Sequence, residues 1–229
     1  MDSDTTMNTA GNKHDRSRLA FTLIEMLMVI TIMGIVATLV VTMGQAAAQK
    51  KKIVAVEGEK NKLITMIGNY YAKLNYYPPD NADLVSNTLS RYNYGTWAAT
   101  NPLLYELTGA TNYNNGTTLA VFNSTNIMAS AYQNVFNRAG VANGDALEPH
   151  NFFHPGPFPK EYAVCATNQN TLFFSLIVPT ELVQGITNNY WHYDSSTTNR
   201  HNPNSYDLWA EFSIGTKNGK LLIITNGNW

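Results

Sequence analysis

The sequence contains little cysteine, little charge and none of the common catalytic motifs. Cys165 is the single cysteine in 229 residues, which excludes an intramolecular disulfide. Charged residues make up 14%, and the formal net charge of -1 gives no general case for nucleic-acid binding. No Gly-Lys-Ser/Thr phosphate-binding motif is present, and no serine lies in a nucleophile elbow. We therefore expect a protein that is not an enzyme.

One long hydrophobic run stands out near the start of the chain. From Phe21 to Gly44 the residues are apolar except for small hydroxyls and one carboxylate, Glu25. As a helix this run reaches about 36 Å, which is enough to cross a bilayer. A carboxylate inside such a span costs about 2.5–3.5 kcal/mol and is usually kept for a partner or a function. A plain anchor, with Glu25 reaching the membrane surface, is the simpler alternative.

Residues 1–20 are polar and place Lys13, Arg16 and Arg18 before the hydrophobic run. They have the character of a leader that is removed from the mature protein. The competing process is secretory cleavage after Ala48, which would release a soluble binding domain or enzyme. The apolar run is far longer than the roughly 7–15 residues of a signal-peptide core, which argues against that process.

The segment Phe21-Thr-Leu-Ile-Glu25, the basic leader and Gly34 together resemble the class III signal of type IV pilins and of type II secretion pseudopilins. The resemblance implies that a prepilin peptidase cuts between Ala20 and Phe21 and that the new amine of Phe21 is methylated. It also implies that Glu25 pairs with the Phe21 amine of a neighbouring subunit. The family usually has Gly before the cut, where this chain has Ala20.

The hydrophobic run continues into an amphipathic segment without a strong helix breaker. Pro78-Pro79 removes a backbone donor and predicts the end of one helix over residues 21–77, with residues 21–44 spanning the membrane. Lys50 to Lys52 follow the span and would lie at the membrane surface, against solvent, anionic lipid or an acidic neighbouring subunit. Apolar residues of the second half recur at helical spacing and would hold a sheet: Ile53, Val56, Leu63, Ile67, Tyr70, Leu74 and Tyr77.

The sequence predicts a globular domain over residues 78–229, with its sheet mainly in residues 161–229. The fold class is therefore α+β, with the long helix packed on a small antiparallel sheet, and the resemblance implies that this is a pilin fold. Asn218-Gly219 predicts a tight hairpin turn. Expected helices of an inserted region cover Ala82–Tyr92, Pro102–Thr108 and Asn126–Arg138, and expected strands cover Tyr162–Ala166, Leu172–Val178, Tyr190–Tyr193, Leu208–Ile214 and Leu221–Thr225.

The end of the chain resembles that of major pseudopilins, which carry a Tyr-Asp-Leu strand and a terminal Asn-Trp, here Tyr206-Asp-Leu208 and Asn228-Trp229. That family often binds calcium in the following loop, but Gly215–Lys220 has no carboxylate and two lysines, so we expect no cofactor. If calcium binds elsewhere, Asp194 and Asp207 could supply oxygens. A network of Asn and Asp turns is the favoured alternative.

These features predict a pseudopilin that assembles as a helical homo-oligomer into a periplasmic fibre. By the resemblance, it sits in the inner membrane as a single-pass protein with its C-terminal domain in the periplasm. Its expected partners are the prepilin peptidase, an inner-membrane platform protein and a secretion ATPase, with nucleic acid not expected. The alternatives are a type IV pilin for adhesion, motility or DNA uptake, and the secreted product cleaved after Ala48.

Overall fold

The computed structural model describes residues 21–81, 98–114, 116–122, 125–144, 149–153, 159–183, 185, 188–198 and 200–229. The chain divides into two compact units, Met1–Ala46 and Ala47–Trp229. The expected leader, residue Ala20 and the expected helix at Ala82–Tyr92 lie outside the described residues. The long N-terminal helix followed by antiparallel sheets gives the α+β architecture expected for a pilin fold.

Helix α1 extends from Leu23 to Leu74, close to the expected range of residues 21–77. It ends at Asn75, which takes a left-handed conformation (φ 65°) and donates its N–H to the Tyr71 carbonyl at 2.8 Å. Asn tolerates this conformation better than most residues because its short side chain is polar. The helix therefore ends at Leu74, before residue 77, where the Pro78-Pro79 pair predicted its end.

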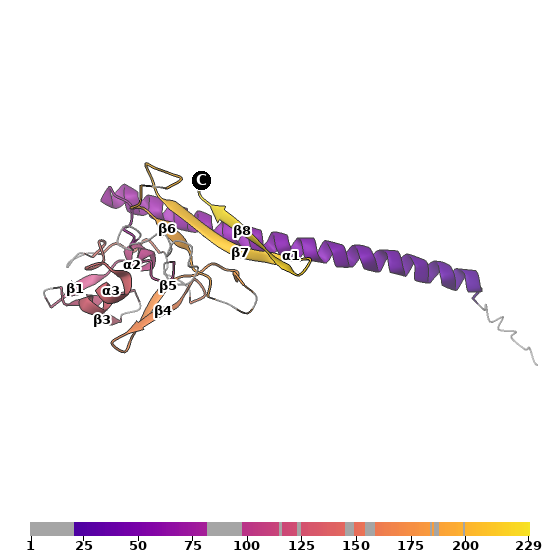
Figure 1. The fold of residues 1–229 in the computed structure, drawn as a ribbon, viewed down its shortest axis with the longest axis horizontal. Coiled ribbons are helices and arrows are strands. Elements are labelled where there is room, and N and C mark those ends of the chain that lie inside the picture. Colours follow the sequence, from indigo (N-terminus) through magenta and orange to yellow (C-terminus); the bar gives the residue numbers. More distant parts are fainter. Residues whose placement is uncertain are drawn as a thin grey trace, which may run out of the picture. The chain divides into compact units, whose positions relative to one another are not determined.

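The second part of α1 carries the main core of the Ala47–Trp229 unit. One stripe of the helix is fully buried, because its side chains pack against alternate residues of a three-stranded sheet. Figure 1 shows this sheet running beside α1. From the helix this core contains Val56, Leu63, Ile67 and Tyr70, and from the sheet Tyr193, Leu208, Ala210 and Phe212. The amphipathic pattern predicted this packing.

That sheet consists of β6 (His192–Asp194), β7 (Asp207–Lys217) and β8 (Lys220–Gly227). The strands are antiparallel and follow in sequence order, with a bulge in β7. Asn218 and Gly219 both have positive φ, 52° and 74°, as a type I′ hairpin turn requires. The expected hairpin is confirmed, and both of its strands are longer than predicted.

A separate hairpin is formed by β4 (Tyr162–Asn168) and β5 (Thr171–Leu176). Both strands lie close to their expected positions. The expected strand at Tyr190–Tyr193 is shifted, because Tyr190 makes only an isolated bridge to Ile177 and β6 begins at His192. The described strands thus form several small sheets instead of the one sheet predicted.

The inserted region differs most from the prediction. Helix α2 (Leu103–Thr108) lies close to the expected range Pro102–Thr108. The helix expected at Asn126–Arg138 is wrong over its first part: residues 126–128 form strand β3, and α3 covers only Ala129–Phe136. Pairing with the neighbouring strand overrides helix propensity here. The small sheet contains β1 (Thr111–Tyr113), β2 (Thr118–Ala120) and β3 (Asn126–Met128).

A second hydrophobic cluster joins this region to the β4–β5 hairpin. The Tyr105 ring of α2 lies 5.6 Å from that of Tyr132 and 5.2 Å from that of Phe136, both on α3. Phe173 of β5 completes the cluster, 5.7 Å from Phe136. Edge-on aromatic pairs of this kind stabilise a core beyond the area that they bury.

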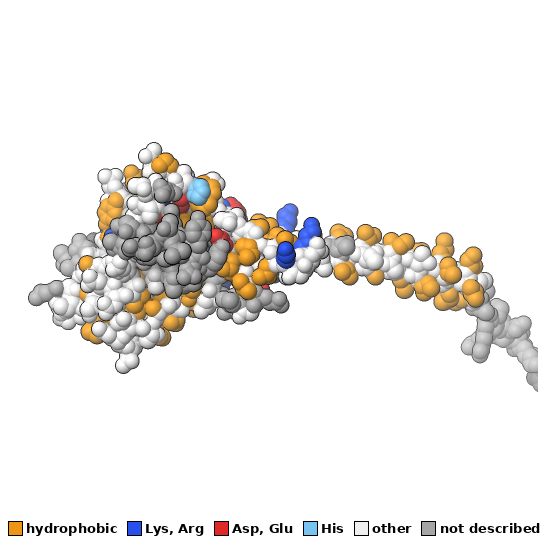
Figure 2. Space-filling view, in the orientation of Figure 1, with side chains coloured by type: hydrophobic (Ala, Val, Ile, Leu, Met, Phe, Trp, Pro, Cys, Tyr) orange, Lys and Arg blue, Asp and Glu red, His pale blue; other side chains and the backbone are white. Residues whose placement is uncertain are grey.

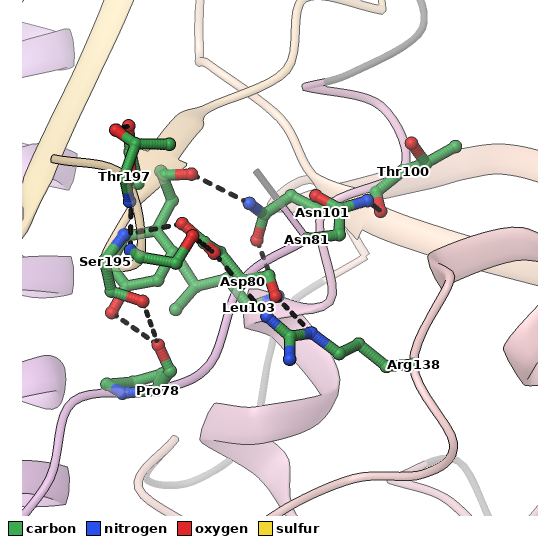
Figure 3. Close-up of polar contacts among 12 residues, drawn as sticks. Pro78, Asp80, Asn81, Thr100, Asn101, Leu103, Arg138, Ser195 and Thr197 are labelled. Carbon is green, nitrogen blue, oxygen red and sulfur yellow. Dashed lines mark hydrogen bonds and ion pairs between the residues drawn. The ribbon is translucent and has the colours of Figure 1, made fainter. Parts of the chain in front are cut away.

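The chain leaving α1 is fixed by polar contacts with the loop after β6 (Figure 3). The buried Asp80 carboxylate accepts hydrogen bonds from the Ser195 N–H and the Ser196 hydroxyl, both at 2.5 Å. The Arg138 guanidinium donates to the Asp80 carbonyl. The Pro78 carbonyl accepts a further bond from the Ser195 hydroxyl at 2.8 Å. A buried carboxylate is tolerated because these donors replace water.

Two asparagines continue these contacts toward α2 (Figure 3). The Asn81 amide donates to the Thr100 carbonyl at 2.8 Å, so residues 81 and 100 lie side by side. The Asn101 amide donates to the Tyr193 carbonyl at 3.0 Å, and its oxygen accepts the Leu103 N–H at 2.9 Å. The Asn101 side chain therefore bonds the first residue of α2 and links this helix to β6.

Candidate assembly and processing site

The start of α1 is closed by a reciprocal pair of contacts between Thr22 and Glu25. The Thr22 N–H and hydroxyl both donate to Glu25 Oε2 at 2.8 Å, and the Glu25 N–H donates to the Thr22 hydroxyl at 3.3 Å. This is a capping box, which satisfies backbone donors that the first turn leaves unpaired. The carboxylate also lies at the positive end of the helix dipole. Sequence reasoning missed Thr22, although the Thr-x-x-Glu spacing signals this motif.

The two oxygens of Glu25 differ in their surroundings. Both bonds from Thr22 go to Oε2, and within the described part of the chain Oε1 accepts no hydrogen bond. The adjacent Phe21 is 72% exposed. Oε2 thus caps the chain's own helix, while Oε1 can accept a hydrogen bond from another molecule.

The apolar part of α1 exposes nearly all of its hydrophobic side chains (Figure 2). A window of 18 residues reaches a mean hydropathy of 2.5 and none of it is buried, which makes α1 compatible with a single-pass membrane anchor. The hydroxyls of Thr31 and Thr38 donate back to helix carbonyls at 2.7 Å, so they need no partner outside the helix. The surface is therefore suited to lipid or to other apolar helices.

Gly34 has no side chain and so leaves a gap in this apolar surface. A Cβ placed on Gly34 would meet nothing within 4 Å, so the glycine fills no packing need inside the chain. In a helix interior Gly is less favourable than Ala by about 1 kcal/mol. Small residues on apolar helices allow neighbouring helices to approach closely. The position is consistent with a helix that packs against other helices.

The two calcium candidates, Asp194 and Asp207, face each other across β6 and β7. Asp194 accepts the backbone N–H of Ser196 and of Thr197, at 3.2 and 2.9 Å. Asp207 accepts two N–H groups of its preceding loop, at 2.7 and 3.0 Å. Within the described ranges, no group of three or more His, Cys, Asp or Glu residues is placed to hold a metal. Both carboxylates thus serve turn networks, the alternative favoured from sequence.

Other potentially reactive side chains among the described residues are buried or stacked against aromatic rings. Burial raises the pKa of the Cys165 thiol to about 12, so it is protonated at neutral pH and a poor nucleophile. His192 is buried and stacks on Trp209, and burial lowers its pKa to about 4. His201 stacks on Trp229 at 4.0 Å.

A buried carboxyl in the globular unit was not predicted at all. Glu106 of α2 is 1% exposed and accepts the Tyr70 hydroxyl at 3.1 Å and the N–H groups of Ala142 and Asn143 at 2.8 and 3.0 Å. Burial raises its pKa to about 7 despite these donors. The residue ties α1, α2 and the loop after α3 together, which no local sequence pattern reveals.

The comparisons with known proteins agree with the geometry of the N-terminal segment. The prokaryotic N-terminal methylation motif matches residues 15–41, which include Phe21, Glu25 and Gly34. Together with the long apolar helix, this match identifies the chain as a type IV pilin-like protein. It carries the signal of a prepilin-peptidase substrate that associates with the membrane. Neither the curated proteins nor the solved structures contain a match to the chain.

Proposed function

We propose that the chain is a pseudopilin, a subunit of a type II secretion-like system that assembles into a periplasmic fibre. The observation that carries this proposal is the contact between the two C-terminal motifs. The Asn228 side chain accepts the Leu208 N–H at 2.9 Å and donates to the Tyr206 carbonyl at 3.0 Å. Its backbone N–H donates to the Leu208 carbonyl at 3.1 Å. The pseudopilin-like Tyr-Asp-Leu and Asn-Trp segments therefore form one structural unit.

In this proposal the prepilin peptidase cuts between Ala20 and Phe21 and methylates the new amine. Glu25 then pairs with the Phe21 amine of a neighbouring subunit. Oε1, which accepts no hydrogen bond from the described residues, gives that amine an acceptor, while Oε2 keeps the capping box intact. An ion pair removed from water is strong when further hydrogen bonds satisfy its remaining atoms. Thr22 supplies those bonds to the carboxylate.

The fibre would form as the apolar part of α1 passes from the bilayer into a bundle of identical helices. The lipid-facing side chains gain little from this transfer, because lipid tails and neighbouring helices are similarly apolar. Extraction of the helix therefore needs external work. A cytoplasmic ATPase acting through an inner-membrane platform protein is the source that we propose. The role is structural, without enzymatic activity or a resident cofactor.

Two measurements test the proposal. Mass spectrometry of the mature protein should find N-methylated Phe21 at its start. A start at Gln49 would instead indicate a secreted product, and an intact Met1 would indicate a plain anchor. Deletion of the gene should then leave exported proteins trapped in the periplasm while surface filaments, adhesion and DNA uptake are unchanged. Loss of filaments with normal secretion would assign the chain to a surface pilus.

A further inference from the structure

Lysines gather at the end of the Ala47–Trp229 unit where α1 enters it. Lys50 and Lys51 lie on α1, and Lys217 and Lys220 flank the β7–β8 turn; all four are exposed. We call these four residues the basic surface. Figure 2 shows Lys and Arg side chains standing together on one stretch of the helix. The chain as a whole is nearly neutral, so this concentration of positive charge is local.

The fold brings the turn to the helix through two contacts. The Lys52 ammonium donates to the Ser213 carbonyl of β7 at 3.0 Å. Farther along β7, a Cβ placed on Gly215 would lie 3.5 Å from the Gln49 side-chain nitrogen. The strand therefore runs beside α1 toward its earlier residues. Residues far apart in sequence, near 50 and near 218, are thereby collected at one end of the unit.

The charge of this surface is not neutralised within the described part of the chain. Lys52 is paired, with Glu181 at 3.9 Å, but no ion pair involves any of the four lysines of the basic surface. Lys217 and Lys220 are directly opposite each other in the β7–β8 register. Like charges at such a position destabilise a hairpin. An anionic surface bound at the turn would offset the repulsion between these two lysines.

Position along the chain favours a lipid surface. Lys50 follows Gly44, the end of the apolar run, by six residues, or about 9 Å of helix. The headgroup layer on each side of a bilayer is about 5–8 Å thick, so a lysine side chain starting there can reach phosphates. We propose that the basic surface binds the anionic phospholipid headgroups of the membrane that holds the apolar run. This inference rests on the membrane insertion assumed in the proposed function.

The test uses the full chain with Cys165→Ser and Thr216→Cys, labelled at position 216 with a fluorophore. The protein is reconstituted into vesicles of phosphatidylcholine alone or mixed with phosphatidylglycerol, each containing a lipid with a spin-labelled headgroup that quenches nearby fluorescence. We expect stronger quenching with phosphatidylglycerol, and recovery of fluorescence as salt is raised. Each lysine near an anionic surface should change the ratio of docked to undocked protein by about fivefold.

Lys220→Gln should therefore lower the docked ratio about fivefold, and the Lys217→Gln/Lys220→Gln variant further. Lys73→Gln is the matched control, because it removes the same charge from an exposed residue at the other end of the globular part of α1 and should change nothing. Quenching that is independent of phosphatidylglycerol and of Lys220 would overturn the inference.

Two other results would also overturn the proposed lipid contact, and each would indicate a different explanation. Quenching that rises with the ratio of protein to lipid, and not with phosphatidylglycerol, would show that the lysines face an acidic surface of a second copy. Flotation of the vesicles reports insertion separately. A chain that fails to float even with phosphatidylcholine would refute membrane insertion itself, whereas a chain that floats without charge-dependent quenching would refute only the lipid contact.

Discussion

The Lys60 ammonium lies 2.5 Å from the side-chain oxygen of Asn226, so the middle of α1 is tied to the last strand of the chain. The same ammonium donates to the Gly227 carbonyl at 2.9 Å and lies 3.1 Å from the Glu57 carboxylate. Only 7% of Lys60 is exposed. In the sequence this lysine interrupts the apolar stripe. In the structure it fastens β8 to the helix.

Replacement of Lys60 by methionine should destabilise the protein by roughly 2–4 kcal/mol, because the change leaves Asn226 and the Gly227 carbonyl without their charged donor. Thermal unfolding of the full chain in detergent measures the loss. Lys73→Met is the control, since surface substitutions of this kind usually stay within about 0.5 kcal/mol. Equal effects of the two changes would contradict the role assigned to Lys60.

The terminal tryptophan makes a second prediction possible. Trp229 stacks on His201, and a Cβ on Gly227 would lie 2.7 Å from its ring. Gly227→Ala should therefore displace the ring from His201, at a cost of only about 0.5 kcal/mol because Trp229 is exposed. In a Trp229→Ala background the same change should cost almost nothing. A double-mutant cycle with near-ultraviolet circular dichroism tests this coupling, and additive effects would refute it.

Glu106 should make stability fall as pH rises from about 4.5 to about 7. Its folded-state pKa of about 7 lies above its ordinary value of 4.5, so across this interval the folded state holds a proton that the unfolded state has lost. The difference corresponds to about 3 kcal/mol. The measurement compares the free energy of unfolding against pH for the wild type and for Glu106→Gln. The variant should lack this component of the pH dependence.

His192 acts in the opposite direction and therefore needs its own control. Its pKa is lowered from 6.5 to about 4, so the unfolded state binds a proton across that interval while the folded state does not. Its contribution to stability is present above about pH 6.5 and is lost as the pH falls toward 4. The Glu106→Gln variant should show this rise with pH alone, and a flat profile would contradict the burial of His192.

Glu25 and Thr22 should separate insertion from assembly. If Oε1 binds a neighbour's amine, Glu25→Ala should still be inserted into the membrane but should fail to assemble in register. Thr22→Val removes the hydroxyl contact of 2.8 Å while keeping the carboxylate, so its assembly should weaken without being abolished. Electron microscopy of fibres measures both outcomes. Normal fibres from Glu25→Ala would rule out the pairing.

Patterns that repeat along the sequence predicted the structure well. The apolar run and the amphipathic stripe predicted α1, and Asn218-Gly219 predicted the β7–β8 turn, because these signals depend on neighbouring residues. The strands β1, β2 and β3 have three residues each, too few for alternation to be recognised. The end of α1 at Asn75 was missed because a left-handed asparagine carries a weaker signal than two prolines.

The site was predictable only where its chemistry is local. Phe21 and Glu25 stand out because a charge in an apolar run is conspicuous without any structure. Glu106 looks like an ordinary residue of a short helix, and its burial depends on Tyr70 and on the loop after α3, which are distant in sequence. The basic surface likewise needs the fold, since it combines lysines from α1 with lysines from a turn near the end of the chain.

The hydrogen bond from Asn81 to the Thr100 carbonyl fixes the separation between the points where residues 82–97 leave and rejoin the described fold. A single backbone cut between residues 81 and 98 should therefore leave the two pieces associated, because the contact from Asn81 to Thr100 lies outside the cut segment.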